Sequence, residues 1–277
     1  MPWKEVLPRL GTAGTAGNGD GRPHHGLAAA ARLARHPLPC VQLVVGAGHG
    51  THLPMLVVAR RTGARSVVLM NPSLPRALFD LCVVPEHDGV RAGPGVFLSL
   101  GALNRIRPGP AQRRDGCLVL IGGPSRHCGW DDEGLMNQLR ALLERSRQRV
   151  QLVTSRRTPD TTLRCLQHLD QPLLPFDTTD PDWLAGALPE ADTVWVTQDS
   201  VSMAYEAASA GARIGLLEVP DFRPGRTRQA AQALLDSGRA VSFRHWRDGH
   251  PLQRAEAPLA EADRCACDIL RRWPELA

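Results

Sequence analysis

The chain has 277 residues and a formal charge of +5, with 43% hydrophobic and 22% charged residues. This length can bury the core of one large domain or of two ordinary ones. The sequence has no run of eighteen apolar residues, no basic segment leading into an apolar one at its start, and no basic stripe interleaved with aromatic residues. These absences argue against a transmembrane helix, a secretory signal and nucleic-acid binding.

The first part of the chain alternates apolar runs with polar loops. We expect strands at 6–10, 41–45, 66–70, 79–84 and 96–100, a glycine-rich loop at 11–21 and a helix at 26–35. Pro54 fits the first turn of a further helix, where its missing N–H costs nothing. Residues 105–114 have two prolines, one glycine and no apolar period, which predicts a linker.

The second part repeats the alternation with clearer boundaries. Strands are predicted at 117–121, 150–154, 173–176, 193–197, 213–217 and 240–243, and helices from Asp132, from Thr158 to 169, around Trp183, over 203–210, up to about 235 and over 259–272. Strands that alternate with helices predict an α/β fold of two Rossmann-like, parallel-sheet domains. We place these domains at 1–110 and 111–258, with helix 259–273 completing the first.

Three polar turns each follow a predicted strand of the second domain. They are 122–125 with its glycine pair, 154–158 with two arginines, and 197–202, which opens a helix. The carboxyl ends of parallel strands share one edge of a sheet, and ligands bind there. Gly122, Gly123, Ser125, Arg156 and Arg157 therefore predict a nucleoside-diphosphate site. A tight turn at the glycines and a solvated arginine loop are the alternatives.

The turn at 197–202 adds a hydroxyl and a carboxylate to this prediction. Asp199 and Ser200 come where the helix begins, and Ser202 and Glu206 lie one helical turn apart on the same face. At that spacing, the Ser202 hydroxyl can bind a phosphate while the Glu206 carboxylate binds the ribose hydroxyls of the same nucleotide. The alternative is that Asp199 or Ser200 only caps the helix and Glu206 is a solvated residue.

Two loops of the first domain carry groups for acid/base chemistry. His49 and His52 lie in a glycine loop after the strand at 41–45, and Glu86, His87 and Asp88 follow the strand at 79–84. Imidazole titrates near neutrality and can take a proton from a sugar hydroxyl, so we predict His49 as the general base. Two imidazoles without a carboxylate at ligand spacing do not make a convincing metal site. Polar loop residues without a chemical role remain the alternative for both loops.

Seven segments together resemble a known family. They are 46–54, 69–75, 79–82, 85–88, 120–125, 154–159 and 196–203, within a similarity that covers about residues 41–245. This ordered set is similar to the mitochondrial fission "elongated mitochondria" family in its bacterial branch, whose members are often described as nucleoside-diphosphate-sugar epimerase-like. Residues 16–18 keep only part of the compact glycine loop with which bacterial relatives begin.

That family is in turn similar to GT-B glycosyltransferases, which implies two domains that face a cleft. The resemblance implies a donor site in the second domain, with Ser200 to Glu206 on the nucleotide, an acceptor site and a base in the first domain, and no metal. It further implies a nucleotide-sugar donor and an envelope glycoconjugate or lipid-linked acceptor.

The cysteines bear on where the protein works. They number seven, an odd count, and are widely scattered, which indicates a reducing compartment. We therefore expect a cytoplasmic protein, with peripheral contact to the inner membrane left open. The alternatives from other classes are a non-catalytic interaction protein on a transferase scaffold and a nucleotide-sugar epimerase.

Overall fold

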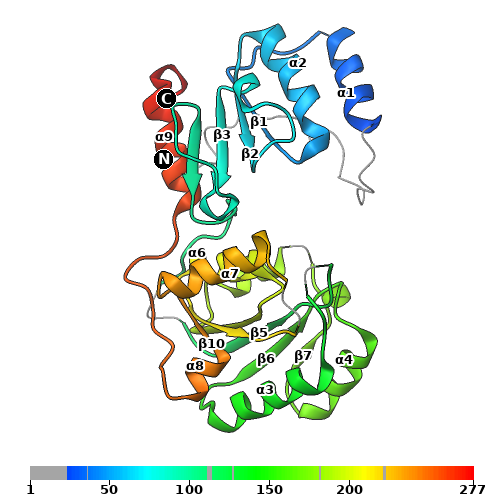
Figure 1. Cartoon of the computed structure of the whole chain (residues 1–277), viewed down its shortest axis with the longest axis vertical. Coiled ribbons are helices and arrows are strands. Elements are labelled where there is room, and N and C mark those ends of the chain that lie inside the picture. The colour runs from blue at the N-terminus through cyan, green and yellow to red at the C-terminus, as the bar shows by residue number, and fades with distance from the viewer. Residues whose placement is uncertain (1–23, 36, 111–113, 127, 181, 221–222) are drawn as a thin grey trace.

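A computed structural model describes residues 24–35, 37–110, 114–126, 128–180, 182–220 and 223–277 (Figure 1). The strand predicted at 6–10, the glycine-rich loop at 11–21 and the partial loop at 16–18 lie outside the described residues. The described chain forms two parallel sheets with helices on both faces, so the predicted α/β fold class is confirmed.

The first sheet has four strands in the order β1 (Leu43–Ala47), β2 (Arg65–Leu69), β3 (Leu81–Pro85) and β4 (Val96–Ser99). Helix α2 (His52–Thr62) covers one face and packs in turn against α1 (His24–Arg35). Helix α9 (Glu261–Arg272) covers the other face (Figure 1). Neighbouring β2 residues show why the strands are apolar throughout: Val67 packs with the α9 cluster and Val68 with the α2 cluster, and both are fully buried.

The second sheet has six parallel strands in the order β10-β9-β8-β5-β6-β7. Their bounds are β5 (Cys117–Ile121), β6 (Val150–Thr154), β7 (Leu173–Leu174), β8 (Thr193–Thr197), β9 (Arg213–Leu217) and β10 (Ala240–Ser242). The chain builds outward from β5 in one direction and then returns to build outward from β8 in the other. The switch point of the topology therefore lies between β5 and β8, where ligand crevices form in such sheets.

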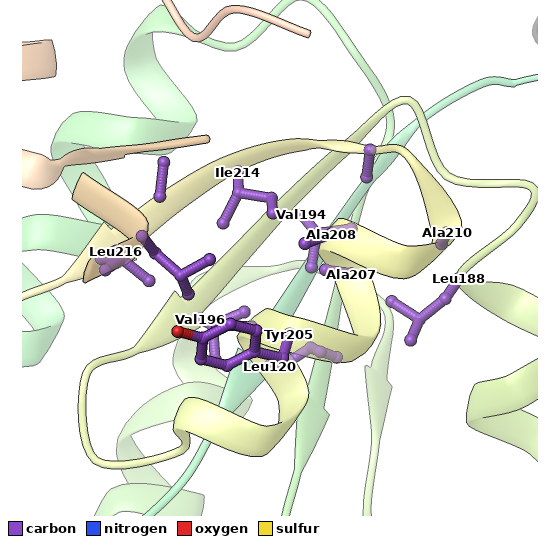
Figure 2. Packing of buried hydrophobic residues seen from close by; sticks show 14 of the residues in the cluster. Leu120, Leu188, Val194, Val196, Tyr205, Ala207, Ala208, Ala210, Ile214 and Leu216 are labelled. Carbon is purple, nitrogen blue, oxygen red and sulfur yellow. The ribbon is translucent and has the colours of Figure 1, made fainter. Parts of the chain in front are cut away.

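Helices cover both faces of the second sheet. They are α3 (Asp132–Arg145), α4 (Asp160–Leu166), α5 (Trp183–Ala187), α6 (Val201–Ala210), α7 (Arg226–Asp236) and α8 (Phe243–Arg247). Figure 2 shows the core under α6, where Tyr205 packs with Leu120, Val196 and Leu216. The opposite face buries Val119, together with α3. Helices α6 and α7 lie on the side of this sheet that is nearer to the first sheet (Figure 1).

The chain returns to the first sheet through α9. The backbone N–H of Leu100, just after β4, donates to Glu261 Oε2 at 2.8 Å, and the Arg264 guanidinium lies 4.3 Å from the centre of the Phe97 ring. The contacts tie α9 to the end of β4. The domain boundary that we place after residue 110 falls between β4 and β5 and stays a prediction.

Several local details differ from the sequence expectation. Asp131 is the N-cap residue of α3, although its side chain makes no capping hydrogen bond, and Asp132 begins the helix. Thr158 does not cap α4, because its hydroxyl lies 2.7 Å from the Gly122 carbonyl and 3.0 Å from that of Ile121. Phe243 begins α8 instead of ending a strand, and its ring packs against Trp195. At Thr158 and Phe243 a tertiary contact outweighs the local preference.

Candidate functional site

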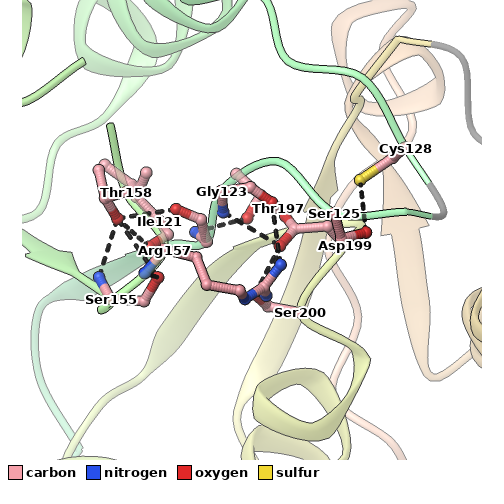
Figure 3. Close-up of polar contacts among 11 residues, drawn as sticks. Ile121, Gly123, Ser125, Cys128, Ser155, Arg157, Thr158, Thr197, Asp199 and Ser200 are labelled. Carbon is pink, nitrogen blue, oxygen red and sulfur yellow. Dashed lines mark hydrogen bonds and ion pairs between the residues drawn. The ribbon is translucent and has the colours of Figure 1, made fainter. Parts of the chain in front are cut away.

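The three predicted loops converge at the switch point of the second sheet, as Figure 3 shows. The Gly122 N–H, just after β5, donates to Thr197 Oγ1 at the end of β8 at 2.8 Å. From the other side, the loop after β6 contributes Arg157, whose Nη1 donates to the Gly123 carbonyl at 2.9 Å. Residues that are widely separated in sequence thus form one polar cluster at the carboxyl edge.

The Asp199 carboxylate is the centre of this cluster. Its side chain is fully buried, and its Oδ2 accepts from the Gly123 N–H at 3.1 Å, from Arg157 Nη2 at 2.6 Å and from Ser200 Oγ at 3.0 Å. Arg157 Nη2 also donates to Ser200 Oγ at 3.0 Å. Four of the residues predicted to hold a diphosphate therefore bind one another, and a carboxylate takes the Gly123 N–H that the prediction reserved for phosphate.

The two glycines allow the loops to lie this close. A Cβ on Gly122 would lie 2.1 Å from Asp199 Oδ2, and a Cβ on Gly123 would lie 1.8 Å from the backbone oxygen of Arg157. Neither position has room for a side chain larger than that of glycine. From the sequence, these glycines suggest a tight turn or a phosphate-binding loop. The structure shows that they let the loop after β5 contact the loops after β6 and β8 directly.

The beginning of α6 presents the remaining predicted ligands. Ser200 is the N-cap residue, and Ser202 is exposed in the first turn, where a helix leaves backbone N–H groups without partners inside the helix. Glu206 is half-buried one turn later, and burial raises its pKa while the nearby charge of Arg105 acts in the opposite direction. Arg156 is exposed in the loop after β6. This end of α6 thus offers a positive helix terminus, a hydroxyl and a carboxylate.

Ser125 lies at the far side of the loop after β5. Its Oγ is 3.4 Å from Sγ of the buried Cys128, and the two backbones are joined by paired hydrogen bonds at 3.3 Å. Ser125 also takes part in a further interaction, so its polar groups are already engaged. Its role in holding a phosphate stays a prediction.

The two histidines after β1 lie in different environments. His49 is exposed in a short 3₁₀ helix, whereas His52 begins α2 and is 3% exposed. Nδ1 of His52 lies 3.3 Å from Ser73 Oγ, and its ring meets the Phe79 ring edge to face. Burial lowers the pKa of His52, and the charge of His49 lowers it further. The sequence names both residues, but it cannot show which of them is accessible.

The lowered pKa of His52 predicts how stability depends on pH. The unfolded chain binds the proton near pH 6.5, before the folded protein does, so this contribution is complete above that pH and is lost as the pH falls below it. We expect the unfolding temperature to drop by about a few degrees between pH 7.5 and 5.5. The slope should be smaller in His52→Gln and intermediate in His49→Gln, because the burial of His52 remains when the charge of His49 is removed. An equal slope in His52→Gln and wild type would contradict this prediction.

A second loop of the first sheet meets the helices of the second. The 3₁₀ helix η4 (Glu86–Asp88) follows β3, and its Asp88 lies 3.3 Å from Nε of Arg226 at the start of α7. The His87 ring lies 6.4 Å from the Tyr205 ring, centre to centre, and burial lowers its pKa. Tyr205 also fills the space beside Gly101, where a Cβ would lie 2.3 Å from its ring. Tyr205 therefore joins the core of one sheet to the edge of the other.

Three further observations concern metal ligands, membrane spans and cysteines among the described residues. Within the described ranges, no group of three His, Cys, Asp or Glu side chains is placed to hold a metal ion. In the same part of the chain, no helix is both long and apolar enough to cross a membrane. All seven cysteines are free thiols.

Comparison with known proteins gives one family and a common fold. The family model described as "Mitochondrial fission ELM1" matches residues 1–273, a wider range than the segments that resemble it in sequence. No curated protein matches the chain.

Among solved structures, one from Listeria monocytogenes, provisionally named a UDP-N-acetylglucosamine 2-epimerase, aligns with a TM-score of 0.53 at 14% identity over 91% of this chain and 79% of its own. The UDP-GlcNAc 2-epimerase of Methanocaldococcus jannaschii aligns with a TM-score of 0.51 at 10% identity over 93% and 84%. At a TM-score of 0.44, MurG of Acinetobacter baumannii is 15% identical over 79% and 64%. Together with the two parallel sheets, the alignments with TM-scores above 0.5 show a GT-B-like fold, as the family resemblance implied.

Proposed function

Because the chain belongs to the mitochondrial fission ELM1 family and has a GT-B-like fold, we propose that it binds a nucleoside-diphosphate sugar and transfers the sugar to an acceptor. The observation that carries this proposal is the polar edge between β5 and β8, where α6 begins at the switch point of a doubly wound sheet. Anionic groups bind at such positions because helix N–H groups and the helix dipole favour negative charge. Because a fold alone does not establish a reaction, the proposal also depends on the roles of the site residues.

In this proposal the donor lies along α6. The beginning of α6 at Ser200 and Ser202 and the Arg156 side chain hold the diphosphate, and Glu206 accepts hydrogen bonds from the ribose hydroxyls. The cluster of Gly122, Gly123, Ser125, Arg157 and Asp199 supports them and orients the Ser200 hydroxyl toward the same edge.

Transfer also needs a base from the first sheet. The acceptor hydroxyl would lose its proton to His49 while its oxygen attacks the anomeric carbon, and the bond from that carbon to the diphosphate oxygen would break with its electron pair. His49 is exposed at the carboxyl edge of the first sheet, so the imidazole is accessible to an acceptor. We place this reaction in the bacterial cytoplasm, at the inner membrane surface, with an envelope glycoconjugate or lipid-linked acceptor.

Two other functions have a specific observation in their favour. Two solved structures with TM-scores above 0.5 are named as 2-epimerases, which favours epimerisation of the same class of donor. Exposed apolar side chains on the first half of the chain, namely Val45, Leu53, Met70 and Leu78, favour a protein partner and a non-catalytic role.

Thermal unfolding against UDP, GDP, ADP, CMP and TDP tests the proposed function. A specific nucleotide at one hundred times its dissociation constant should add about 2.7 kcal/mol of stability, which raises the unfolding temperature by several degrees. Arg156→Ala and Glu206→Ala should lose this shift, whereas Glu144→Ala, an exposed carboxylate on α3, should keep it. Stability that none of the five nucleotides changes would reject the donor site and favour the interaction protein.

A further inference from the structure

The charge of the protein is unevenly distributed along the chain. Residues 24–79 contain six of the 33 Lys and Arg residues of the sequence and none of its 28 Asp and Glu residues. The rest of the chain is therefore close to neutral, and this segment accounts for the net positive charge. In the structure it forms α1, β1, α2 and β2, at the β1 end of the first sheet.

Four of these arginines lie together at the ends of two helices. Arg32 and Arg35 are in the last turn of α1, and Arg60 and Arg61 are in the last turn of α2. The two helices pack side by side (Figure 1), and Nη1 of Arg61 donates to the backbone oxygen of Leu33. The C-terminal ends of α1 and α2 therefore meet. We call these four residues the arginine patch.

Most of the charge of the arginine patch is not balanced by the described chain. All four side chains are exposed, and among the described residues no carboxylate pairs with Arg32, Arg35 or Arg60. Each helix end carries a partial negative charge of about half an elementary charge, which offsets only part of four positive charges. Arg65, which follows α2, is not counted in the patch because two carboxylates lie 3.6 Å from it.

A short apolar loop lies beside the arginine patch. Residues 37–40 are two prolines, a leucine and a cysteine on the way from α1 to β1, and all but the half-buried Leu38 are exposed. The backbone N–H of Arg65 donates to the backbone oxygen of Gln42 at 2.9 Å. This bond holds the end of the loop next to the residues that follow α2.

The arginine patch and the loop face away from the second sheet. They come directly before the parallel strands β1 and β2, so they lie at the amino edge of the first sheet. The second sheet meets the opposite edge, where Asp88, after β3, lies 3.3 Å from Arg226 of α7. His49 precedes the other end of α2, about 16 Å away along the helix axis, so a partner at the patch leaves the predicted base accessible.

Arginines around an apolar loop suit the surface of an anionic lipid bilayer. Anionic headgroups attract the arginines, and apolar side chains between them enter the boundary between headgroups and acyl chains. Single-stranded nucleic acid binds by stacking its bases on aromatic rings, and neither the arginine patch nor residues 37–40 contain such a ring.

We propose that the arginine patch and residues 37–40 dock the protein on an anionic lipid surface. The proposed function places a reaction at a membrane without naming the contact, and this inference goes beyond it by assigning the contact to the amino edge of the first sheet. Docking does not depend on the donor site, so it can be measured without a nucleotide.

Sedimentation of the full chain with lipid vesicles tests the proposal. The protein should bind phosphatidylcholine vesicles that contain about 30% phosphatidylglycerol at least about tenfold better than phosphatidylcholine alone. Binding should weaken as the salt concentration rises from about 0.1 M to about 0.5 M, because salt screens the charges. The double variant Arg32→Gln/Arg35→Gln should bind about twentyfold more weakly, since each arginine near such a surface strengthens binding about fivefold.

A second double variant controls for net charge. Arg147→Gln/Arg149→Gln removes the same charge from exposed positions between α3 and β6 in the second sheet, so it should change vesicle binding less than about twofold. Both double variants should unfold within about two degrees of the wild type, because exposed arginines contribute little to stability.

A fluorescent label shows which face of the protein docks. Cys40, Cys165 and Cys267 are the exposed thiols, so variants that keep only one of them can be labelled at a single position. An environment-sensitive dye on Cys40, in the apolar loop, should shift to the blue when anionic vesicles are added. The same dye on Cys165, in α4 of the second sheet, should not shift.

The outcomes separate docking from the proposed function. Equal binding to neutral and anionic vesicles, or wild-type binding by Arg32→Gln/Arg35→Gln, would overturn the proposal. A wild type that ignores vesicles but binds polyaspartate would assign the patch to an acidic protein and overturn it as well. Nucleotide binding without vesicle binding rejects docking alone, whereas vesicle binding without any nucleotide binding rejects the donor site alone.

Discussion

Gly123→Ala is expected to lower the free energy of unfolding by at least about 4 kcal/mol, because the added methyl group has no space. Its Cβ would lie 1.8 Å from the backbone oxygen of Arg157 and 2.3 Å from the carbonyl carbon of that residue. Backbone atoms cannot rotate away as a side chain would, so the loops after β5 and β6 must separate. Their separation also breaks the hydrogen bonds from Gly123 to Asp199 and from Arg157 to Gly123. Urea unfolding of the two proteins measures the loss.

Gly186→Ala is the matched control for this substitution. Gly186 lies in α5, has an ordinary backbone conformation, and has no atom within 4 Å of an added Cβ. Alanine there should be neutral or should stabilise the protein by about 0.5–1 kcal/mol. A Gly123→Ala variant as stable as Gly186→Ala would show that the loops do not make the contact described here.

Arg157→Ala is expected to lower the free energy of unfolding by about 3 kcal/mol, because it leaves the fully buried Asp199 carboxylate without its cation. The Arg157 side chain is 42% exposed, so the cost comes mainly from the carboxylate and not from lost packing of the arginine. The double variant with Asp199→Ala should recover part of the loss, with a coupling of about 1–3 kcal/mol in a double-mutant cycle. Denaturant unfolding of the four proteins gives the cycle.

The neighbouring arginine provides the control for that cycle. Arg156 is exposed in the same loop, and its removal should change stability by no more than about 0.5 kcal/mol. The sequence pattern does not distinguish the two arginines. A difference in stability between Arg156→Ala and Arg157→Ala therefore measures the effect of the Asp199 contact, which only the fold provides. Equal effects of Arg156→Ala and Arg157→Ala would show that the Asp199 pair contributes little to stability.

The sequence determined the strands of the second sheet closely. The predicted strands 117–121, 150–154, 193–197 and 213–217 match β5, β6, β8 and β9 residue for residue. Buried parallel strands are short apolar runs that end at glycine or polar residues, and this signal is local. In the first sheet the strand expected at 41–45 is β1 at Leu43–Ala47, because its pairing with Leu69 of β2 extends it to Ala47.

The sequence predicted where the loops of the candidate site lie, and the structure shows which of their residues bind one another. The sequence located the loops after β5, β6 and β8, since the carboxyl ends of parallel strands share an edge. It could not show that Asp199 would occupy the Gly123 N–H and pair with Arg157. Arg157 and Asp199 are separated by 42 positions in the chain, and Gly123 and Asp199 by 76. Only the packing of the loops brings these residues together.

By itself the sequence determined the fold class, the order of strands and helices, and the residues that carry charge or hydroxyl groups. Tertiary structure alone decided which of them lost contact with water. His49 and His52 are three residues apart, yet only His52 is buried, and Asp88 is buried by a helix that begins 138 positions later in the chain. Burial depends on what packs against a residue from elsewhere in the chain, and it is burial that gives a carboxylate or an imidazole its unusual chemistry.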